Sequence, residues 1–265
     1  MKKTCIVFVL FGISFFASCE DNHQEKLVSD NYQLVWSDEF NYEGLPDSSN
    51  WTFEEGYRRN NEPQFYTKNR LENVSVGNGI LKIKARNEDW LYKNIAKVTS
   101  GSITTGGKHA WKYGRFDIMA KVPTGKTVWP AIWMLGDSHY ADRTYNVEID
   151  IMEYYGYSPK EIHNVLHYRS SDNLFQKKIN VESLGENAYN GFHLYSILWD
   201  EKQIIYAIDN QITFVCDISK INSSYQPFNE PLYLLINLAL LSSNLDKEQE
   251  FEIDYVRVYQ KIQSN

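Results

Sequence analysis

Residues 146–156 read NVEIDIMEYYG, and this short run decides how the chain folds. Side chains of a β-strand point alternately to opposite faces, so Glu148 and Asp150 would share one face while the isoleucines that follow them point to the other. Glu153 breaks this alternation, because it lies three positions after Asp150. The stretch therefore predicts a strand with an acidic outer face, an apolar inner face, and one acid out of step.

The position of Glu153 predicts a local irregularity in that strand. In a regular strand its carboxylate would turn inward with the isoleucines, and burial of an unpaired carboxylate costs several kcal/mol. A β-bulge places one additional residue in one strand of a pair and shifts the alternation by one position. We predict such a bulge at Ile151 and Met152, which would return Glu153 to the face of Glu148 and Asp150.

The rest of the chain repeats the strand pattern without a sustained helical stripe. In ILKIKAR, residues 80–86, apolar and basic residues alternate with the period of a half-buried strand. Asp209 and Asn210 lie between two further strand-like runs, where they favour a hairpin turn. Other short runs rich in β-branched and aromatic residues are 113–122, 127–135, 161–168, 192–200 and 251–260. These segments predict an all-β domain built as a two-sheet antiparallel sandwich.

Residues 1–18 predict an export signal, because two lysines precede an apolar run too short to span a membrane and small residues follow it. The ending FASC resembles a bacterial lipobox, which implies lipidation of Cys19 and a lipid anchor to the outer membrane. An ordinary cleaved signal and a periplasmic protein are the alternative. We expect residues 19–31 to form a polar tether and residues 32–265 to form one catalytic domain. Acidic residues after the cysteine resemble surface-export signals of some Gram-negative bacteria, which suggests display on the cell surface.

Charge and cysteine content exclude several partners and stabilising devices. Without residues 1–18 the chain keeps 25 basic and 34 acidic residues, and a net charge of −9 argues against nucleic acid as a partner. Cys216 is the single cysteine of the expected domain, so no intrachain disulfide can form. A domain of this size can be stabilised by core burial alone. The sequence carries no signal for assembly, and we expect a monomer.

Three acids on one strand face suggest three kinds of site. With a bulge, the Cα atoms of Glu148 and Glu153 would lie roughly 13 Å apart, and glutamates that lean together would bring their carboxyl groups to about 5 to 6 Å. This is the separation in a retaining glycosidase, where one carboxylate attacks the anomeric carbon and the other protonates the leaving oxygen. Asp150 would hydrogen-bond Glu148 and raise the pKa of Glu153 by like-charge repulsion. A solvated strand face and a Ca²⁺ site of carboxylate oxygens are the alternatives.

The surrounding motifs resemble glycoside hydrolase family 16, the β-jelly-roll endo-glycanases that include laminarinases, lichenases and agarases. The resemblance covers nearly all of residues 33–260 and rests on NNEPQFYT, YGRFDIMAKVP, KVPTGKTVWPAIWMLG, LHY, GFHLYSILWD, INLAL and IDYVRVYQ, which follow the family's order. It implies a jelly-roll with a concave substrate cleft, Glu148 as nucleophile, Asp150 as assisting acid and Glu153 as general acid/base. EIDIME is similar to the bulged E-x-D-x-x-E branch, mainly laminarinases and agarases, and differs from the unbulged E-x-D-x-E of lichenases.

The same resemblance implies a set of sugar-contacting residues. Trp129 and Trp133 match positions that line the cleft, although tryptophans at this spacing in a strand also suit a core. His167 and Asn237 are similar to polar cleft residues on neighbouring strands. Asn61 matches a loop residue that contacts sugar. We therefore expect a polysaccharide or glycan as the binding partner of this surface.

The resemblance implies a structural metal but no cofactor for catalysis. Asp254 and Gly79 match the convex-side position where family members often bind Ca²⁺, and the alternative is that Asp254 pairs with a nearby base. His163 and His167 suggest a second metal pair. HNVLH lacks the Glu of H-E-x-x-H and lies in a strand pattern, so we predict no zinc site there.

The residues that set specificity depart from those of a typical laminarinase. Ser102 stands where glucanases of this branch commonly carry Arg, and residues 241–250 replace the usual Gly-Gly and Trp. We expect an endo-acting, retaining enzyme for β-1,3- or mixed-linkage glucan. The alternative is an endo-β-galactosidase that cuts mucin O-glycans or poly-N-acetyllactosamine. A non-catalytic glycan-binding protein would lack Glu148 or Glu153, and both are present.

Overall fold

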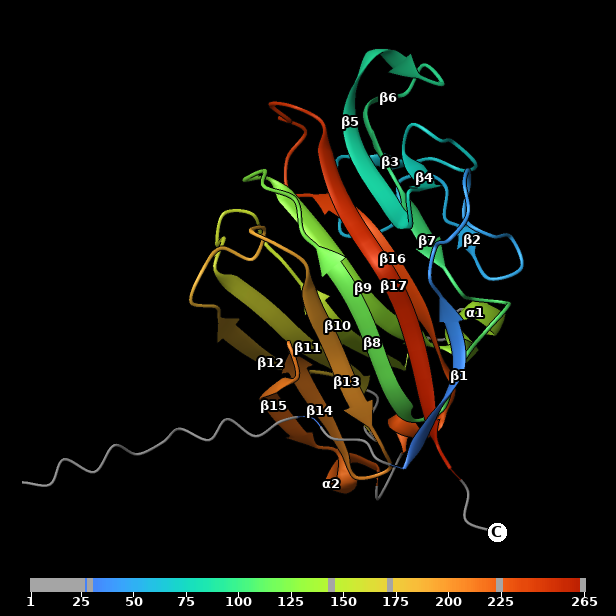
Figure 1. The fold of residues 1–265 in the computed structure, drawn as a ribbon, viewed down its shortest axis with the longest axis vertical. Coiled ribbons are helices and arrows are strands. Elements are labelled where there is room, and N and C mark those ends of the chain that lie inside the picture. The colour runs from blue at the N-terminus through green and yellow to red at the C-terminus, as the bar shows by residue number, and fades with distance from the viewer. Residues whose placement is uncertain (1–26, 28–30, 143–145, 171–173, 223–225, 263–265) are drawn as a thin grey trace, which may run out of the picture.

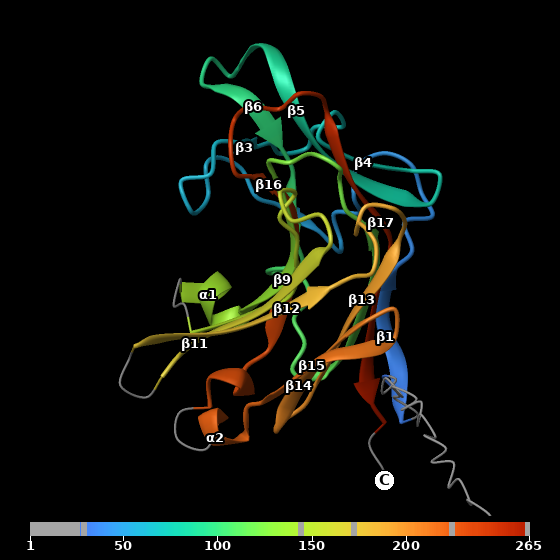
Figure 2. The same ribbon diagram turned by 90° about the vertical axis from the view of Figure 1, so that its left-hand side faces the viewer.

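The computed structural model describes residue 27 and residues 31–142, 146–170, 174–222 and 226–262. Within these ranges the strands form two stacked sheets, one of ten strands and one of seven (Figure 1, Figure 2). The predicted all-β antiparallel sandwich is confirmed. In the same ranges, no helix combines the length and the apolar character needed to cross a membrane.

The seven-stranded sheet is antiparallel throughout and runs in the order β12-β11-β10-β9-β16-β7-β2. The stretch that opened the sequence analysis is β10, close to the middle of this sheet. The strands are β2 (Thr52–Phe53), β7 (Ser102–Thr104), β9 (Val128–Gly136), β10 (Val147–Glu153), β11 (Glu161–Arg169), β12 (Phe175–Ser183) and β16 (Leu232–Leu240).

The ten-stranded sheet runs in the order β15-β14-β13-β8-β17-β5-β6-β3, with β1 paired to β17 and β4 to β5. Only the short β3–β6 pair is parallel among the described strands. The strands are β1 (Tyr32–Asp38), β3 (Phe65–Tyr66), β4 (Val74–Gly77), β5 (Ile80–Tyr92), β6 (Ala96–Ser100), β8 (Gly114–Lys121), β13 (His193–Trp199), β14 (Gln203–Ile208), β15 (Gln211–Asp217) and β17 (Gln249–Lys261). The helical segments are α1 (Asp137–Asp142), α2 (Ser219–Asn222) and the 3₁₀ turn η1 (Pro227–Asn229).

One apolar core fills the space between the sheets. Alternate side chains of each strand point into it, as the strand period requires. Full burial of each such side chain stabilises the fold by about 1.5–3 kcal/mol. Fully buried examples from the central strands are Phe116, Ile118, Val128, Ile132, Met134, Val147, Ile149, Val256 and Val258.

A second, smaller apolar cluster lies on the other face of the seven-stranded sheet. It comes from β9 and β16 and comprises Ala131, Trp133, Leu135, Tyr233 and Leu235. These side chains point away from the main core, because the main core is packed against the opposite face of the seven-stranded sheet. Apolar groups outside the core are usual in the floor of a ligand site.

The predicted hairpin is present between β14 and β15. Asp209 and Asn210 adopt φ of 51° and 64°, the left-handed pair of a type I′ turn, whose twist matches that of the flanking strands. The N–H of Leu27 donates to the carbonyl of Asn210 at 2.9 Å, and the Leu27 side chain is buried. The folded domain therefore includes a residue that the sequence analysis placed in the tether.

A close backbone approach fixes the end of β10. Gly156 donates its N–H to Val128 O at 3.0 Å, and a Cβ at Gly156 would lie 1.8 Å from Gly125 O. Only glycine fits this position without moving the backbone. The contact explains why the opening stretch ends in Gly, and it holds the end of β10 against the start of β9.

Candidate active site

The predicted bulge lies between Asp150 and Glu153, where it is needed to turn Glu153 to the face of the other two acids. Against β9, Asp150 pairs with Trp133 and Met152 pairs with the next residue, Ile132, so two positions of β10 face one step of β9. The pairing with β11 shifts at the same place, between Asp150 and Glu153. The bulge prediction is confirmed.

The bulge works because two consecutive apolar residues enter the core. Ile151 is 1% exposed and Met152 is 0% exposed, and both belong to the core between the sheets. Asn164 on β11 donates its side-chain N–H to the carbonyl of Ile151 at 2.8 Å, so the carbonyl displaced from the regular ladder keeps a partner. Glu153 consequently points to the same side as Glu148 and Asp150.

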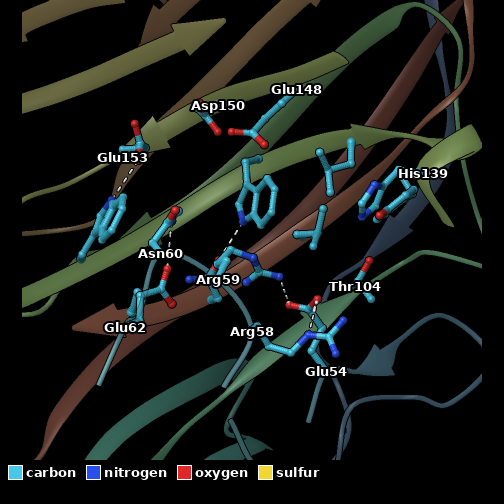
Figure 3. Close-up of a pocket in the computed structure, with 18 of the residues that line it drawn as sticks. Glu54, Arg58, Arg59, Asn60, Glu62, Thr104, His139, Glu148, Asp150 and Glu153 are labelled. Carbon is cyan, nitrogen blue, oxygen red and sulfur yellow. Dashed lines mark hydrogen bonds and ion pairs between the residues drawn. The ribbon is translucent and has the colours of Figure 1, made fainter. Parts of the chain in front are cut away.

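The three acids line one cavity of about 780 Å³ on the outer face of the seven-stranded sheet. Figure 3 shows them along one side, with Arg58, Arg59 and Glu54 across from them. Strand register extends the acidic row outward, because Glu148 pairs with His167 on β11 and His167 pairs with Lys177 on β12. Paired residues of neighbouring strands share a face. The pairing register of the seven-stranded sheet therefore also determines which side chains line the cavity.

Asp150 is the most deeply buried of the three acids, at 4% exposure. Burial raises its pKa well above the ordinary value, and the neighbouring carboxyls of Glu148 and Glu153 raise it further. A protonated Asp150 can donate a hydrogen bond to Glu148, which its pairing with that side chain allows. Asp150 thus holds Glu148 in place without adding a second negative charge.

Glu153 also keeps its proton to a higher pH than an exposed glutamate. Burial raises its pKa, and this effect outweighs the opposing hydrogen bonds from Trp129 Nε1 at 2.9 Å and Tyr155 OH at 3.3 Å. The like-charge effect predicted for Glu153 falls on Asp150 instead, and desolvation is the main cause at Glu153. A carboxylic acid with a raised pKa facing a cavity is suited to proton donation.

His167 is a neutral neighbour of the acids. Its Nε2 lies 3.6 Å from Glu148 Oε1 and 3.6 Å from Asp150 Oδ2. Burial, with a smaller effect from the charge of Lys177, lowers the pKa of His167 to about 4. The imidazole is therefore uncharged at pH 7 and is available for hydrogen bonds to a polar ligand.

The structure brings most of the predicted sugar-contacting residues to this cavity. Trp129, Trp133, His167 and Asn237 line it, whereas Asn61 does not, and the preceding Asn60 takes that place. Asn60 and Asn61 have φ of 55° and 53°, so the chain turns sharply there and presents neighbouring side chains in different directions.

The two tryptophans differ in what their rings offer. Trp129 is half-buried, and its ring stacks on Tyr155 with centroids 5.3 Å apart. Trp133 is 6% exposed, and its Nε1 donates to Asn237 Oδ1 at 2.7 Å. Asn237 in turn donates to Tyr66 OH at 3.0 Å. Trp133 and Asn237 therefore belong to a buried polar network in the cavity floor.

Sequence reasoning missed several cavity residues, among them Lys177, Arg58 and Arg59. Lys177 was missed because it lies in the alternating pattern of β12, where a lysine is expected to face solvent. Arg58 and Arg59 lie in the loop GYRRNNE, and two charged residues in a loop are usually no more than solvent-exposed polar positions. The signal that could have found the arginines is Ser102, which replaces the Arg expected in that strand. Ser102 donates to the Glu54 carboxylate at 2.6 Å, and Arg59 forms an ion pair with the same carboxylate.

One group of side chains in the described ranges has the spacing of a cation site, and it lies within the cavity. One ligand atom from each of Glu148, Asp150 and His167 falls within 4.8 Å of the others. Burial raises the pKa of Asp150, so a cation bound there would have to displace a proton from that carboxyl, which weakens the site for a cation. His163 and His167 are four residues apart on a strand, roughly 13 Å, too far to share a zinc ion.

The residues predicted to hold Ca²⁺ lie side by side on the ten-stranded sheet. Ile253 pairs with Leu81, which places Asp254 beside the turn at Gly79. Among the described residues, no basic side chain forms a salt bridge with Asp254, so the alternative of a simple ion pair loses its support. Gly79 has φ of +76°, a conformation that glycine adopts readily. Cys19, the predicted lipidation site, lies outside the described residues.

Comparison with known proteins agrees with this geometry. Residues 61–257 match the family model for glycosyl hydrolases family 16. A β-glucanase of Rhodothermus marinus is 34% identical over 99% of this chain and 96% of its own. The X-ray structure of the laminarinase from Rhodothermus marinus has a TM-score of 0.77 at 34% identity, over 88% of this chain and 98% of its own. A non-specific endo-β-1,3(4)-glucanase, co-crystallised with 1,3-β-D-cellotriosyl-glucose, has a TM-score of 0.80 at 32% identity, over 89% of this chain and 98% of its own.

Removal of the indole donor should raise the pKa of Glu153. Trp129→Phe keeps an aromatic ring but deletes the N–H that stabilises the charged carboxylate, so the proton should leave at higher pH. NMR titration of protein with labelled glutamate would measure the shift. Tyr155→Phe, which deletes the longer hydrogen bond, should give a smaller shift in the same direction. A pKa that stays constant or falls in Trp129→Phe would contradict this account.

Proposed function

Because the chain belongs to glycosyl hydrolases family 16, we propose that this glycoside hydrolase is a retaining endo-β-glucanase for β-1,3- or mixed-linkage glucans. The observation that carries the proposal is the outward-facing acid trio on the bulged strand β10, in a cavity large enough for sugar units. A keratan-sulfate endo-1,4-β-galactosidase of Sphingobacterium multivorum is similar at 26% identity. The proteins described above are more similar, at 32–34% identity, and are glucanases or a laminarinase. They favour glucan over the galactose-containing chains that the sequence left as the alternative. Catalysis by members of this family needs no cofactor.

The proposed reaction begins with Glu148 as the nucleophile. Its carboxylate attacks the anomeric carbon, the bond from that carbon to the leaving oxygen breaks, and Glu153 transfers its proton to that oxygen. This leaves a sugar covalently bound to Glu148 and a Glu153 carboxylate. Glu153 then takes a proton from water while the water oxygen attacks the same carbon, which releases Glu148.

The protonation states that this reaction needs agree with the surroundings of each acid. Glu153 begins with a proton, and burial raises its pKa in that direction. Glu148 must begin ionised, and a protonated Asp150 stabilises a negative neighbour by donating a hydrogen bond. Two inversions at one carbon return the original configuration, so the product should keep the anomeric form of the substrate.

Glu148→Gln should lower kcat by at least about 1,000-fold, because an amide cannot act as the nucleophile. The variant should still bind oligosaccharide, as measured by calorimetry. Glu161→Gln on β11 is the matched control, because Glu161 is half-exposed and does not line the cavity, and its kcat should stay within about twofold of wild type. Wild-type turnover by Glu148→Gln, or an inverted product in early NMR spectra, would refute the assignment.

Digestion of three substrates tests the substrate class. Laminarin, barley mixed-linkage glucan and mucin O-glycans should be compared at equal mass, with product lengths read by chromatography. We expect internal cleavage of one or both glucans, with mixtures of oligosaccharides from the first time points. Faster cleavage of the mucin glycans would replace the glucan proposal with the endo-β-galactosidase alternative.

We also propose that Asp254 and the Gly79 carbonyl bind a structural Ca²⁺. Their proximity and the lack of a salt bridge at Asp254 within the described ranges support it. Chelator should lower the melting temperature by roughly 5–10 °C, and added Ca²⁺ should restore it. Asp254→Asn should remove this response. An unchanged melting temperature in chelator would rule out the metal.

We propose that the protein is an outer-membrane lipoprotein, displayed at the cell surface and anchored through Cys19. The lipobox-like FASC and the acidic residues that follow support it. Cells fed a labelled fatty acid should label the wild-type protein and leave Cys19→Ser unlabelled. Protease added to intact cells should degrade the protein. An unlabelled wild type would refute the anchor, and full protection would refute surface display.

A further inference from the structure

Arg59 reaches across the cavity and covers a residue expected to bind sugar. Its guanidinium carbon lies 4.8 Å from the centroid of the Trp133 ring, the distance of a cation–π contact. Its Nη2 donates to Glu54 Oε2, and the same carboxylate oxygen accepts from Ser102 Oγ. Figure 3 shows Arg59 facing the acids from the opposite wall. The ring face of Trp133 is therefore not open for stacking against a sugar.

The backbone fixes Arg59 in this position. The N–H of Glu62 donates to the carbonyl of Arg59 at 3.1 Å, and both residues between them have left-handed φ. This is the geometry of a type I′ turn, which asparagine tolerates well. Asn60 Nδ2 also donates to Glu62 Oε1 at 3.1 Å. The turn fixes the backbone at Arg59, and the contacts with Glu54 and the Trp133 ring hold its guanidinium, so little conformational entropy is lost on ligand binding.

Arg59 retains a buried donor nitrogen that no hydrogen bond of the described residues uses. Its Nη1 is buried and has no hydrogen-bond partner there, while its Nη2 is taken by Glu54. A buried donor without a partner is unfavourable, so an oxygen that reaches it gains more than at an exposed site. Glu54 pairs with both Arg58 and Arg59, and the carboxylate of Glu62 also acts on Arg59, so the charge of Arg59 is balanced locally, which suits an uncharged acceptor such as a sugar hydroxyl.

The register places Trp133, the residue that Arg59 covers, beside the acids of β10. Trp133 pairs with Asp150 across neighbouring strands, which lie about 4.8 Å apart. One sugar unit is of about this size. We propose that Arg59 is a specificity-determining residue whose Nη1 hydrogen-bonds a hydroxyl of a neutral sugar beside the cleavage point, in place of stacking on Trp133. This inference rests on the proposed glucanase function.

Binding of laminarin oligosaccharides to Glu148→Gln protein tests the proposal without turnover. Addition of Arg59→Met should weaken the calorimetric Kd about 3- to 10-fold, because it removes the donor and keeps a stem of similar length. Arg86→Met is the matched control, since Arg86 also has a buried nitrogen without a partner but does not line the cavity. Its Kd should equal that of the parent.

Two measurements separate lost recognition from a damaged fold. Arg59→Met removes the closer of the two arginines that pair with the buried Glu54 carboxylate, so Glu54→Gln/Arg59→Met should recover melting temperature while binding stays weak. Arg59→Met should also increase quenching of tryptophan fluorescence by acrylamide, because the face of Trp133 becomes accessible. Binding restored together with melting temperature would show that Arg59 acts only through the fold.

The remaining outcomes are distinct. Equal Kd with and without Arg59, in a protein whose wild type degrades laminarin, would overturn this inference and leave the glucanase proposal intact. Failure of wild type to degrade any β-glucan would overturn the glucanase proposal itself.

Discussion

A carboxylate cannot be left unpaired in an apolar core, and the site depends on how β10 respects that constraint. The inner side of the strand must supply apolar groups to the core, and the outer side must supply acids to the cavity. A strict alternation cannot meet both needs with the spacing found here. The bulge at Ile151 and Met152 meets them by sending two consecutive side chains inward, and Asn164 satisfies the carbonyl that this displaces.

The same acids oppose the stability of the fold at neutral pH. The folded pKa of Asp150 lies above its ordinary value of 3.8, so the folded state holds a proton that the unfolded state has released. The folded state then binds more protons, and stability falls as pH rises from about 3.8 through the folded pKa. Glu153 acts in the same direction from 4.5 upward. The core and the paired strands must offset this cost, as is common where a site is built for chemistry.

Local rules predicted the features that depend on neighbouring residues in the chain. Alternation gave the strands and the bulge, and Asp-Asn gave the hairpin at Asp209. Most of the missed features depend on contacts between distant segments. Arg59 covers Trp133 because a long side chain reaches from the β2–β3 loop to β9, and no periodicity encodes such reach. The exchange of Asn61 for Asn60 follows from turn geometry that the family motif alone does not specify.

The bulge also determines how the strand would respond to the loss of a residue. Deletion of Ile151 or Met152 would leave E-x-D-x-E, in which plain alternation already turns all three acids outward. Deletion of Ile149 would place two acids side by side and force one of them into the core. Two deletions only a few positions apart in one strand would therefore have opposite effects on the site. The bulge could therefore be lost in a related protein by a single deletion that buries none of the three acids.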